Sequence, residues 1–427
     1  MKLNYKRTFF IGFAFLSICA FWQLYDSIVP LILKNTFKIG DTVAGAVMAA
    51  DNVMALFLLP LFGALSDKVK TPIGKRMPFI IGGTAMAVVF MILLPVSDNK
   101  VNLPMFIIAL FLTLVAMGTY RSPAVALMPD LTPKPLRSKA NAIINLMGAV
   151  GGMVSLVLIS FLVKKVDKPN YLPLFACIAA LMVLAVVILI FTVNENKLLH
   201  TIEGLDREEP KNEEEKTTSE SSKLPKDVFR SLAFILVSIS FWFMAYNAVT
   251  TAFSKYAQDF LKLEGGGFAG KMLLATAAAI ITYIPSGLIA SKIGRKKTIM
   301  LGILLMFVCF SLAFTYTEYK PSMNILLVFI GVGWALINVN SYPMVVEMSK
   351  GSDIGKYTGY YYTFSMAAQI LTPILSGALL EFVGYRTLFP YAAVFMALAF
   401  LTMTAVRHGD SKPVPPKDKL TMPDGLD

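Results

Sequence analysis

The chain has 427 residues, of which 56% are hydrophobic and only 15% are charged. Soluble domains are usually about 25% charged, whereas apolar runs of roughly 20 residues, each long enough to cross a bilayer, recur along this sequence. The composition therefore excludes a soluble globular domain and indicates a polytopic membrane protein. The net charge of +12 is assigned to basic loops that orient such a protein, and nucleic acid is not expected as a partner.

The first apolar run, Phe9 to Leu33, follows the basic start MKLNYKR. It is too long for the apolar core of a signal peptide and lacks a small-residue cleavage site, so we expect an uncleaved first helix. The whole sequence predicts an all-α protein with twelve transmembrane helices, at residues 9–33, 42–65, 77–96, 103–128, 140–163, 171–193, 228–254, 268–290, 298–316, 323–348, 357–380 and 386–406.

Lys and Arg are concentrated in the segments that lie on the same side of the membrane as the N-terminus. Because basic residues are enriched in cytoplasmic loops, we expect both termini in the cytoplasm and a multi-pass protein of the cell (plasma or inner) membrane.

Residues 194–227 contain the stretch REEPKNEEEKTTSESSK, which is polar, charge-mixed and without an apolar period. Such a segment cannot bury enough surface to fold, and it predicts a flexible cytoplasmic linker. It divides the chain into two six-helix bundles, 1–193 and 228–407, followed by a cytoplasmic tail, 408–427. The halves repeat weakly, since SPAVALM near residue 125 corresponds to YPMVVEM 220 residues later. Two six-helix repeats joined by a central loop are a known transporter plan.

The loop after the second helix reads GALSDKVKTPIGKR, and GLIASKIGRKK follows the eighth helix. This resembles the loop signature of the major facilitator superfamily, with two extra residues in its middle. The resemblance implies a conformational gate, in which Asp67 pairs with nearby cations in one state only; the alternative is ordinary basic loop charge. Ser291 replaces the acid in the second copy, so we expect a weaker latch there. The gate residues are Gly63, Asp67, Lys68, Gly74, Lys75 and Arg76.

A closer resemblance covers the first five helices. PLFGALSDKVKTPIGKRMPFIIGG and ALMPDLTPKPLRSKANAIINLMGAVGG are similar to the sugar:cation symporters, which include the glycoside–pentoside–hexuronide family and plant-type sucrose carriers. The resemblance implies a twelve-helix fold and uptake of a sugar or glycoside coupled to H⁺ or Na⁺. We separately expect no cofactor and a functional monomer.

Two positions depart from that pattern. The sucrose carriers place an arginine two residues after the helix 4 proline, where this chain has Val125; Arg121 lies one turn earlier, about 6 Å away on the same face. Melibiose-type sodium symporters carry acids on helix 2, where this chain has Ala55 and Leu59, so H⁺ is favoured over Na⁺.

Charged residues inside a bilayer usually face a cavity or a partner. The candidates are Asp26, Asp51, Arg121 and Glu347, of which Glu347 lies near a helix end. We hypothesise that protonation of a carboxylate releases Arg121 to bind sugar hydroxyls, which links proton and substrate binding. Either Asp26 or Asp51 fits that role, and a static charge pair that fixes helix packing is the alternative.

Sugar sites also need aromatic platforms and neutral hydrogen-bonding groups. Helices 1, 4, 5, 7, 10 and 11 line the cavity in the superfamily, and they carry suitable side chains. The resulting candidate substrate-binding set is Trp22, Gln23, Tyr25, Arg121, Asn141, Asn145, Trp242, Tyr246, Asn247 and Asn338, with Trp334 and Asn340 also on helix 10. Gly148 and Gly152 form a GxxxG pattern that predicts close helix packing.

Two other functions compete with sugar symport. A proton-coupled exporter or antiporter of a small metabolite or drug would use the same fold, although NLMGAVGG lacks the Gly-Pro of exporter signatures. A membrane enzyme or sensor is disfavoured because the sequence shows no nucleophile–base arrangement, metal-ligand spacing or phosphate loop.

Overall fold

The computed structural model describes residues 4–132, 137–166, 168–198, 225–348 and 354–410. Within these ranges, twelve helices are long and apolar enough to span a membrane. A helix pairs all of its own backbone groups, which is what a lipid environment demands. The helices are α1 Tyr5–Asn35, α2 Asp41–Lys68, α3 Met77–Asn99, α4 Leu103–Asp130, α5 Arg137–Leu162, α6 Leu172–Thr192, α8 Lys226–Asp259, α9 Gly267–Ile293, α10 Arg295–Ala313, α11 Met323–Val346, α12 Ile354–Phe382 and α13 Leu388–Thr404.

The prediction of an all-α protein with twelve spans is confirmed, with shifts at several helix ends. The largest shift affects the seventh span, because α8 continues to Asp259 instead of ending near residue 254. Lys255 therefore belongs to a helix rather than a loop. Most of the predicted linker and tail, residues 199–224 and 411–427, lies outside the described residues.

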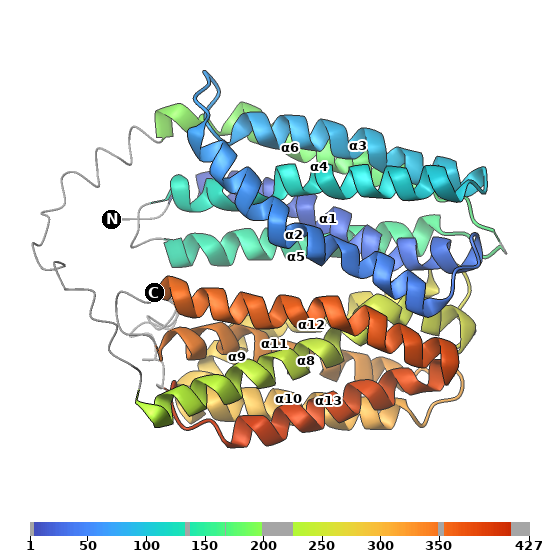
Figure 1. Cartoon of the computed structure of the whole chain (residues 1–427), viewed down its shortest axis with the longest axis vertical. Coiled ribbons are helices and arrows are strands. Elements are labelled where there is room, and N and C mark those ends of the chain that lie inside the picture. The colour runs from blue at the N-terminus through green and yellow to red at the C-terminus, as the bar shows by residue number, and fades with distance from the viewer. Residues whose placement is uncertain (1–3, 133–136, 167, 199–224, 349–353, 411–427) are drawn as a thin grey trace, which may run out of the picture.

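The helices form two groups of six, α1–α6 and α8–α13, which lie side by side with their axes running in a common direction (Figure 1). We call the end of the bundle where α6 stops and α8 starts the linker end, and the opposite end the far end. Within the first half α1 packs on α5 and α3 on α4; within the second, α10 and α9 pack on α11.

The close packing of α5 on α1 depends on a glycine. A Cβ atom on Gly151 would overlap the backbone of Leu16, so only glycine allows the two helices this approach. The predicted packing of α5 is therefore present, but Gly151 makes its closest contact rather than Gly148 or Gly152, which lie near Cys19 and Gln23.

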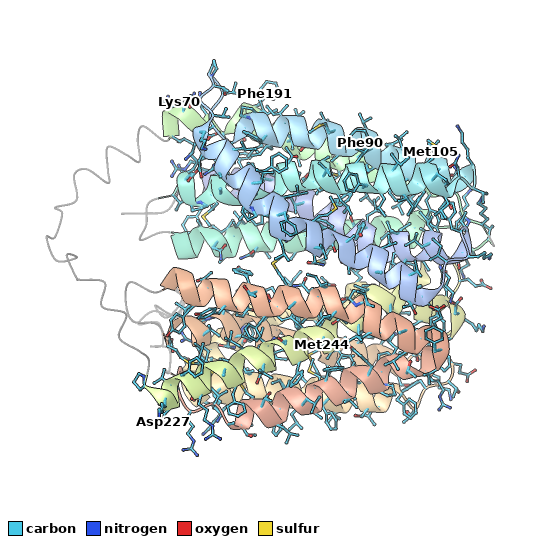
Figure 2. All side chains as sticks on the ribbon, viewed as in Figure 1. Lys70, Phe90, Met105, Phe191, Asp227 and Met244 are labelled. Atoms are coloured by element: carbon cyan, nitrogen blue, oxygen red, sulfur yellow. The ribbon has the colours of Figure 1, made fainter. Side chains whose placement is uncertain are left out.

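The outer surface is apolar. Phe191 and Phe161 are 85% and 83% exposed, and side chains of this kind project from the bundle along its length, whereas Lys70 and Asp227 lie at the linker end (Figure 2). An apolar outer surface between two polar ends suits a protein surrounded by lipid. The chain is an integral multi-pass membrane protein.

Candidate functional site

The first half contributes three ionisable side chains from inside its spans. Asp26 lies on α1, Asp51 on α2 and Arg121 on α4, each at least two turns from the nearer helix end. All three are partly exposed, and Arg121 interacts electrostatically with both carboxylates. Among the ion pairs between described residues, none joins Arg121 to either acid. The charges are therefore close enough to influence one another without being locked together.

Arg121 has an aromatic neighbour instead. Its guanidinium carbon lies 5.5 Å from the ring centroid of Trp22 on α1, a cation–π geometry that positions the side chain without neutralising it. The indole Nε1 of Trp22 is buried and has no hydrogen-bond partner among the described residues. The guanidinium thus keeps donors available for a solute.

The second half contributes an aromatic platform. Tyr246 on α8 stacks on Trp334 on α11 with ring centroids 3.7 Å apart and planes 3° from parallel, and Phe243 meets Trp334 edge to face at 5.5 Å. Tyr283 on α9 lies beside Asn338 on α11. Tyr246, Asn247 and Asn338 are all partly exposed.

The two clusters belong to one region of the molecule. Tyr362 on α12 lies within electrostatic range of Arg121, and Cys19 on α1 lies within range of Tyr283 on α9. We give the name central site to two groups of side chains taken together. The first half contributes Asp26, Asp51, Arg121 and Trp22, and the second half contributes the Tyr246–Trp334 stack and Asn338.

Three further predicted residues lie on α1 and α5, two helices that pack on each other. Gln23 donates a hydrogen bond to Ser27 at 3.1 Å. Asn141 and Asn145 are exposed and share a face of α5 with Gly148, which approaches Cys19.

Two predicted residues do not face the central site. Trp242 is 0% exposed and Tyr25 is 1% exposed, and the Tyr25 hydroxyl donates to the Met48 carbonyl oxygen on α2. Both therefore belong to the packed core, and in this conformation no solute can contact them. Helical spacing alone could not separate these buried positions from partly exposed neighbours such as Tyr246.

The predicted gate loop forms a charge cluster at the linker end. Arg76, only 4% exposed, bonds to Asp67 and Ser66, and its Nε donates to Asp130 at 2.9 Å. Lys75 pairs with Asp130 at 3.0 Å. Asp67 thus has cations beside it as expected.

The same cluster contributes three more details. Gly63 supplies its carbonyl oxygen to Arg76 at 3.2 Å, Gly74 takes a φ of 118° that favours glycine, and Lys68 is exposed. Glu347, the candidate from the tenth predicted span, lies directly after α11 and pairs with Arg295 at the corresponding place in the second half.

Sequence reasoning missed Glu195, which lies in the predicted linker. It is 0% exposed and accepts hydrogen bonds from the backbone N–H groups of Lys75, Arg76 and Met77 at the start of α3. A carboxylate is favoured at a helix N-terminus. In the second half Asp410 accepts from the Lys296 backbone N–H at 2.8 Å, so the arrangement repeats. The sequence did contain a signal for this contact, because an acidic residue follows the last helix of each half.

No group of three or more His, Cys, Asp or Glu side chains that could hold a metal occurs in the described part of the chain. The cysteines are unpaired thiols. The central site instead combines a cation, two carboxylates and stacked rings from both halves of a twelve-helix bundle, which is the composition of a solute-binding site in a membrane transporter.

The chain belongs to the Major Facilitator Superfamily, whose family model matches residues 11–282 and 267–423. It is similar to an uncharacterized MFS-type transporter of Methanocaldococcus jannaschii, with 23% identity over 93% of this chain and 94% of that protein. It is also 27% identical to a sucrose transport protein of Arabidopsis thaliana, over 31% of this chain and 25% of that one. The chain is therefore a membrane transporter and not an enzyme.

Solved structures share the fold. The nucleoside transporter NupG matches with a TM-score of 0.68 at 15% identity, over 95% of this chain and all of that one. The xylose transporter XylE from E. coli, in an inward open conformation, matches with a TM-score of 0.63 at 16% identity, over 96% of both chains.

Proposed function

We propose that this transporter imports a sugar or glycoside together with a proton, by alternating access to the central site. The proposed setting is the cell membrane with both termini cytoplasmic, and the proposed unit is a monomer without a cofactor. The observation that carries the proposal is Arg121, which rests on Trp22 and faces Asp26 and Asp51 without a direct ion pair to either.

The charges supply the coupling. While the carboxylates are ionised, their attraction holds the Arg121 guanidinium toward them. Protonation of one carboxylate weakens that attraction, and Arg121 then hydrogen-bonds substrate hydroxyls. By linkage, bound sugar in turn favours the protonated carboxylate, so the two solutes bind together.

The rings supply the recognition. A pyranose presents apolar C–H faces and a rim of hydroxyls, which suits an aromatic platform such as Tyr246 on Trp334 beside neutral amides such as Asn338. The resemblance to sugar:cation symporters supports this substrate class, as do the sucrose and xylose transporters among the similar proteins.

The absence of acids at Ala55 and Leu59 on α2 supports H⁺ rather than Na⁺ as the coupling ion. We expect an inward pH gradient to drive uptake, and an equal Na⁺ gradient at constant pH to leave it unchanged.

The test is uptake of radiolabelled disaccharides into proteoliposomes under imposed pH or Na⁺ gradients. Arg121→Ala should lower proton-driven uptake by about 100-fold, the loss expected when the contacts of a charged group to its ligand are removed. Arg230→Ala, at the linker-end start of α8, is the matched control and should transport normally. Normal uptake by Arg121→Ala would reject the mechanism. Efflux driven by inward protons would instead support the exporter alternative.

A further inference from the structure

A series of aromatic contacts leads from the central site toward the linker end. Phe243 on α8 meets Trp334 edge to face on one side and contacts Tyr361 on α12 at 6.5 Å on the other. Tyr361 in turn contacts Tyr342 on α11 and Tyr362 on α12, each with ring centroids 5.5 Å apart. From Trp334 to Tyr342 the series extends about 12 Å along α11, which is the rise of eight helical residues.

Tyr361 is the buried member that holds two more exposed rings in place. Its side chain is 6% exposed, and its hydroxyl hydrogen-bonds with that of Ser341 at 3.1 Å. Tyr342 and Tyr362 pack against it with 36% and 55% of their surface exposed. The centroids of these two rings are 6.4 Å apart and their planes are 39° from parallel. They therefore present an angled aromatic surface.

Tyr362 faces the first half of the molecule. It lies about three helical turns before Pro373, on the same side of α12. That side meets α2, because a Cβ on Gly45 would overlap the carbonyl oxygen of Pro373. Arg121 on α4 is also within electrostatic range of Tyr362. A side chain that points at the first half and is still 55% exposed borders open space between the halves.

A tyrosine near a helix end often anchors the helix at the membrane surface instead. Tyr360 suits that role, because successive helical residues point about 100° apart and Tyr360 therefore lies almost opposite Tyr362 on α12. Its ring neighbour is Tyr357, outside the Tyr342–Tyr362 surface. Membrane anchoring thus accounts for Tyr360 and leaves Tyr362 unexplained.

The chemistry of the angled surface suits a neutral polar ring. A pyranose can pack its C–H faces on aromatic rings and bond its hydroxyls to tyrosine hydroxyls. The Tyr342 hydroxyl pairs with that of Thr358 at 3.0 Å, whereas the Tyr362 hydroxyl makes no hydrogen bond within the described part of the chain. Both side chains are neutral, so binding to them does not require a proton.

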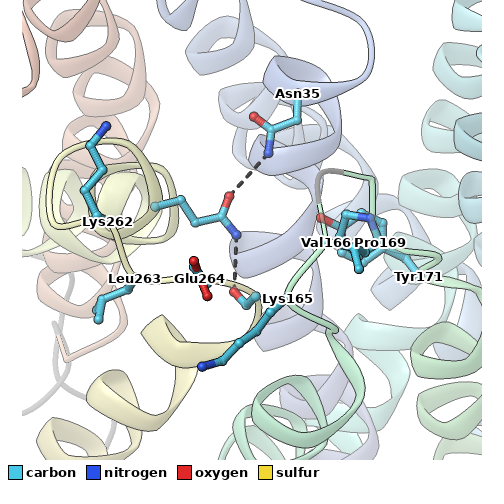
Figure 3. Close-up of a pocket in the computed structure, with 10 residues that line it drawn as sticks. Asn35, Lys165, Val166, Pro169, Tyr171, Lys262, Leu263 and Glu264 are labelled. Atoms are coloured by element: carbon cyan, nitrogen blue, oxygen red, sulfur yellow. Dashed lines mark hydrogen bonds between the residues drawn. The ribbon is translucent and has the colours of Figure 1, made fainter.

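The far end presents a different lining. A cavity of about 300 Å³ opens there between the loops that follow α5 and α8, and Lys165, Lys262 and Glu264 are among its lining residues (Figure 3). The one aromatic residue in that lining, Tyr171, is only 3% exposed. A sugar would meet charged groups at this cavity and open aromatic rings on the linker side.

We propose that Tyr342 and Tyr362, fixed by Tyr361, form a second sugar-binding position between the central site and the linker end. The transported sugar occupies it on its passage between the central site and that end of the bundle. The inference rests on the proposed function, because it takes the substrate to be a sugar. It adds a neutral binding position to a central site that is charged.

Protection of a cysteine from alkylation tests the proposal on the full-length protein in nanodiscs. The background is cysteine-free, with Ala in place of Cys19, Cys177 and Cys309. Thr358→Cys then places a single thiol beside Tyr342. Arg121→Ala is added to weaken the central site, so that protection reports the second position. The probe is the disaccharide that wild type takes up fastest under an inward pH gradient.

The sugar should slow maleimide labelling of Thr358→Cys by at least about fivefold at concentrations well above its dissociation constant. The ratio of the rates with and without sugar should be equal at about pH 6 and pH 8, because the position contains no group that titrates between them. Absence of protection, or protection that follows pH, would overturn the proposal.

Replacing one ring tests which residue binds. Tyr362→Ala should reduce the protection to less than about twofold, and Tyr362→Phe should retain most of it, because the ring remains. Tyr360→Ala is the matched control on the opposite side of α12, and it should leave the protection unchanged. Equal protection in Tyr362→Ala and Tyr360→Ala would also overturn the proposal.

Two readouts separate the possible failures. Each variant should keep a monodisperse profile and its labelling rate without sugar, which shows that the fold near Thr358→Cys is intact. Uptake of sugar by wild type, with no protection at Thr358→Cys, would reject the second position alone. Uptake of no disaccharide at all would reject the proposed function and the second position together.

Discussion

At the scale of single residues, the two carboxylates of the central site differ in their surroundings. Asp51 accepts a hydrogen bond from the Asn52 side chain at 2.8 Å, which favours its ionised form. Asp26 makes no hydrogen bond or ion pair that the structure describes, although it is partly exposed. The sequence left the choice between them open, and this difference favours Asp26 as the carboxylate that exchanges the proton.

Asp26→Asn should therefore uncouple transport rather than abolish binding. The amide resembles the protonated acid, so exchange of labelled for unlabelled sugar should stay within about threefold of wild type, while proton-driven accumulation falls by about tenfold or more. Counterflow and gradient-driven uptake measured on the same proteoliposomes check both numbers. Asp227→Asn, in the exposed first turn of α8, is the control. If Asp26→Asn still accumulates sugar, Asp51 becomes the coupling residue.

The candidate site also shows what a sequence reveals about individual residues. Charged residues such as Arg121 stand out because placing a charge inside a bilayer is unfavourable in free energy. Aromatic residues do not, because buried packing and solute contact both favour them. Trp242 and Tyr246 lie on the same helix, but only Trp242 belongs to the buried core. Trp334 mattered through its stack with Tyr246, a contact across 88 residues that no local pattern encodes.

At the scale of elements, the helices were predictable and their ends less so. Hydrophobic length sets a span, whereas the end depends on partners far away in sequence. α8 runs on to Asp259 because Lys255 and Asp259 find partners on α2 and α1. Glu195 shows the same limit, since its hydrogen bonds to the start of α3 cross about 120 residues.

Glu195 attaches the segment after α6 to the loop before α3, together with Asn196, whose side chain donates to the carbonyl oxygens of Thr71 and Pro72. Glu195→Ala should lower the free energy of unfolding by about 1–3 kcal/mol, because three backbone N–H groups at a helix start lose their acceptor. Thermal unfolding of the detergent-solubilised protein measures the change. Glu318→Ala is the matched control, because its side chain is 71% exposed and its ion pair with Lys320 contributes little. A thermal midpoint equal to that of the control would show that the contact carries no stability.

At the scale of the whole molecule, the two halves repeat each other and have the same orientation along the bundle. Acids after α6 and α13 accept hydrogen bonds at the starts of α3 and α10, so both gate loops lie at the linker end. The buried Asp41–Lys255 ion pair between the halves lies at the opposite, far end. The two ends of the bundle therefore differ in their charge contacts, and the topology decides which of them faces the cytoplasm.

The distribution of basic residues predicts that the linker end is cytoplasmic. Lys70 and Lys100 provide a matched pair to test this, because they are exposed and lie beyond opposite ends of α3. In intact cells, a membrane-impermeant maleimide should label Lys100→Cys in the cysteine-free background and should reach Lys70→Cys only after permeabilisation. The reverse pattern would place the linker end outside the cell. The direction of proton-driven symport would still follow the gradients, so that result would overturn the predicted topology and leave the proposed import standing.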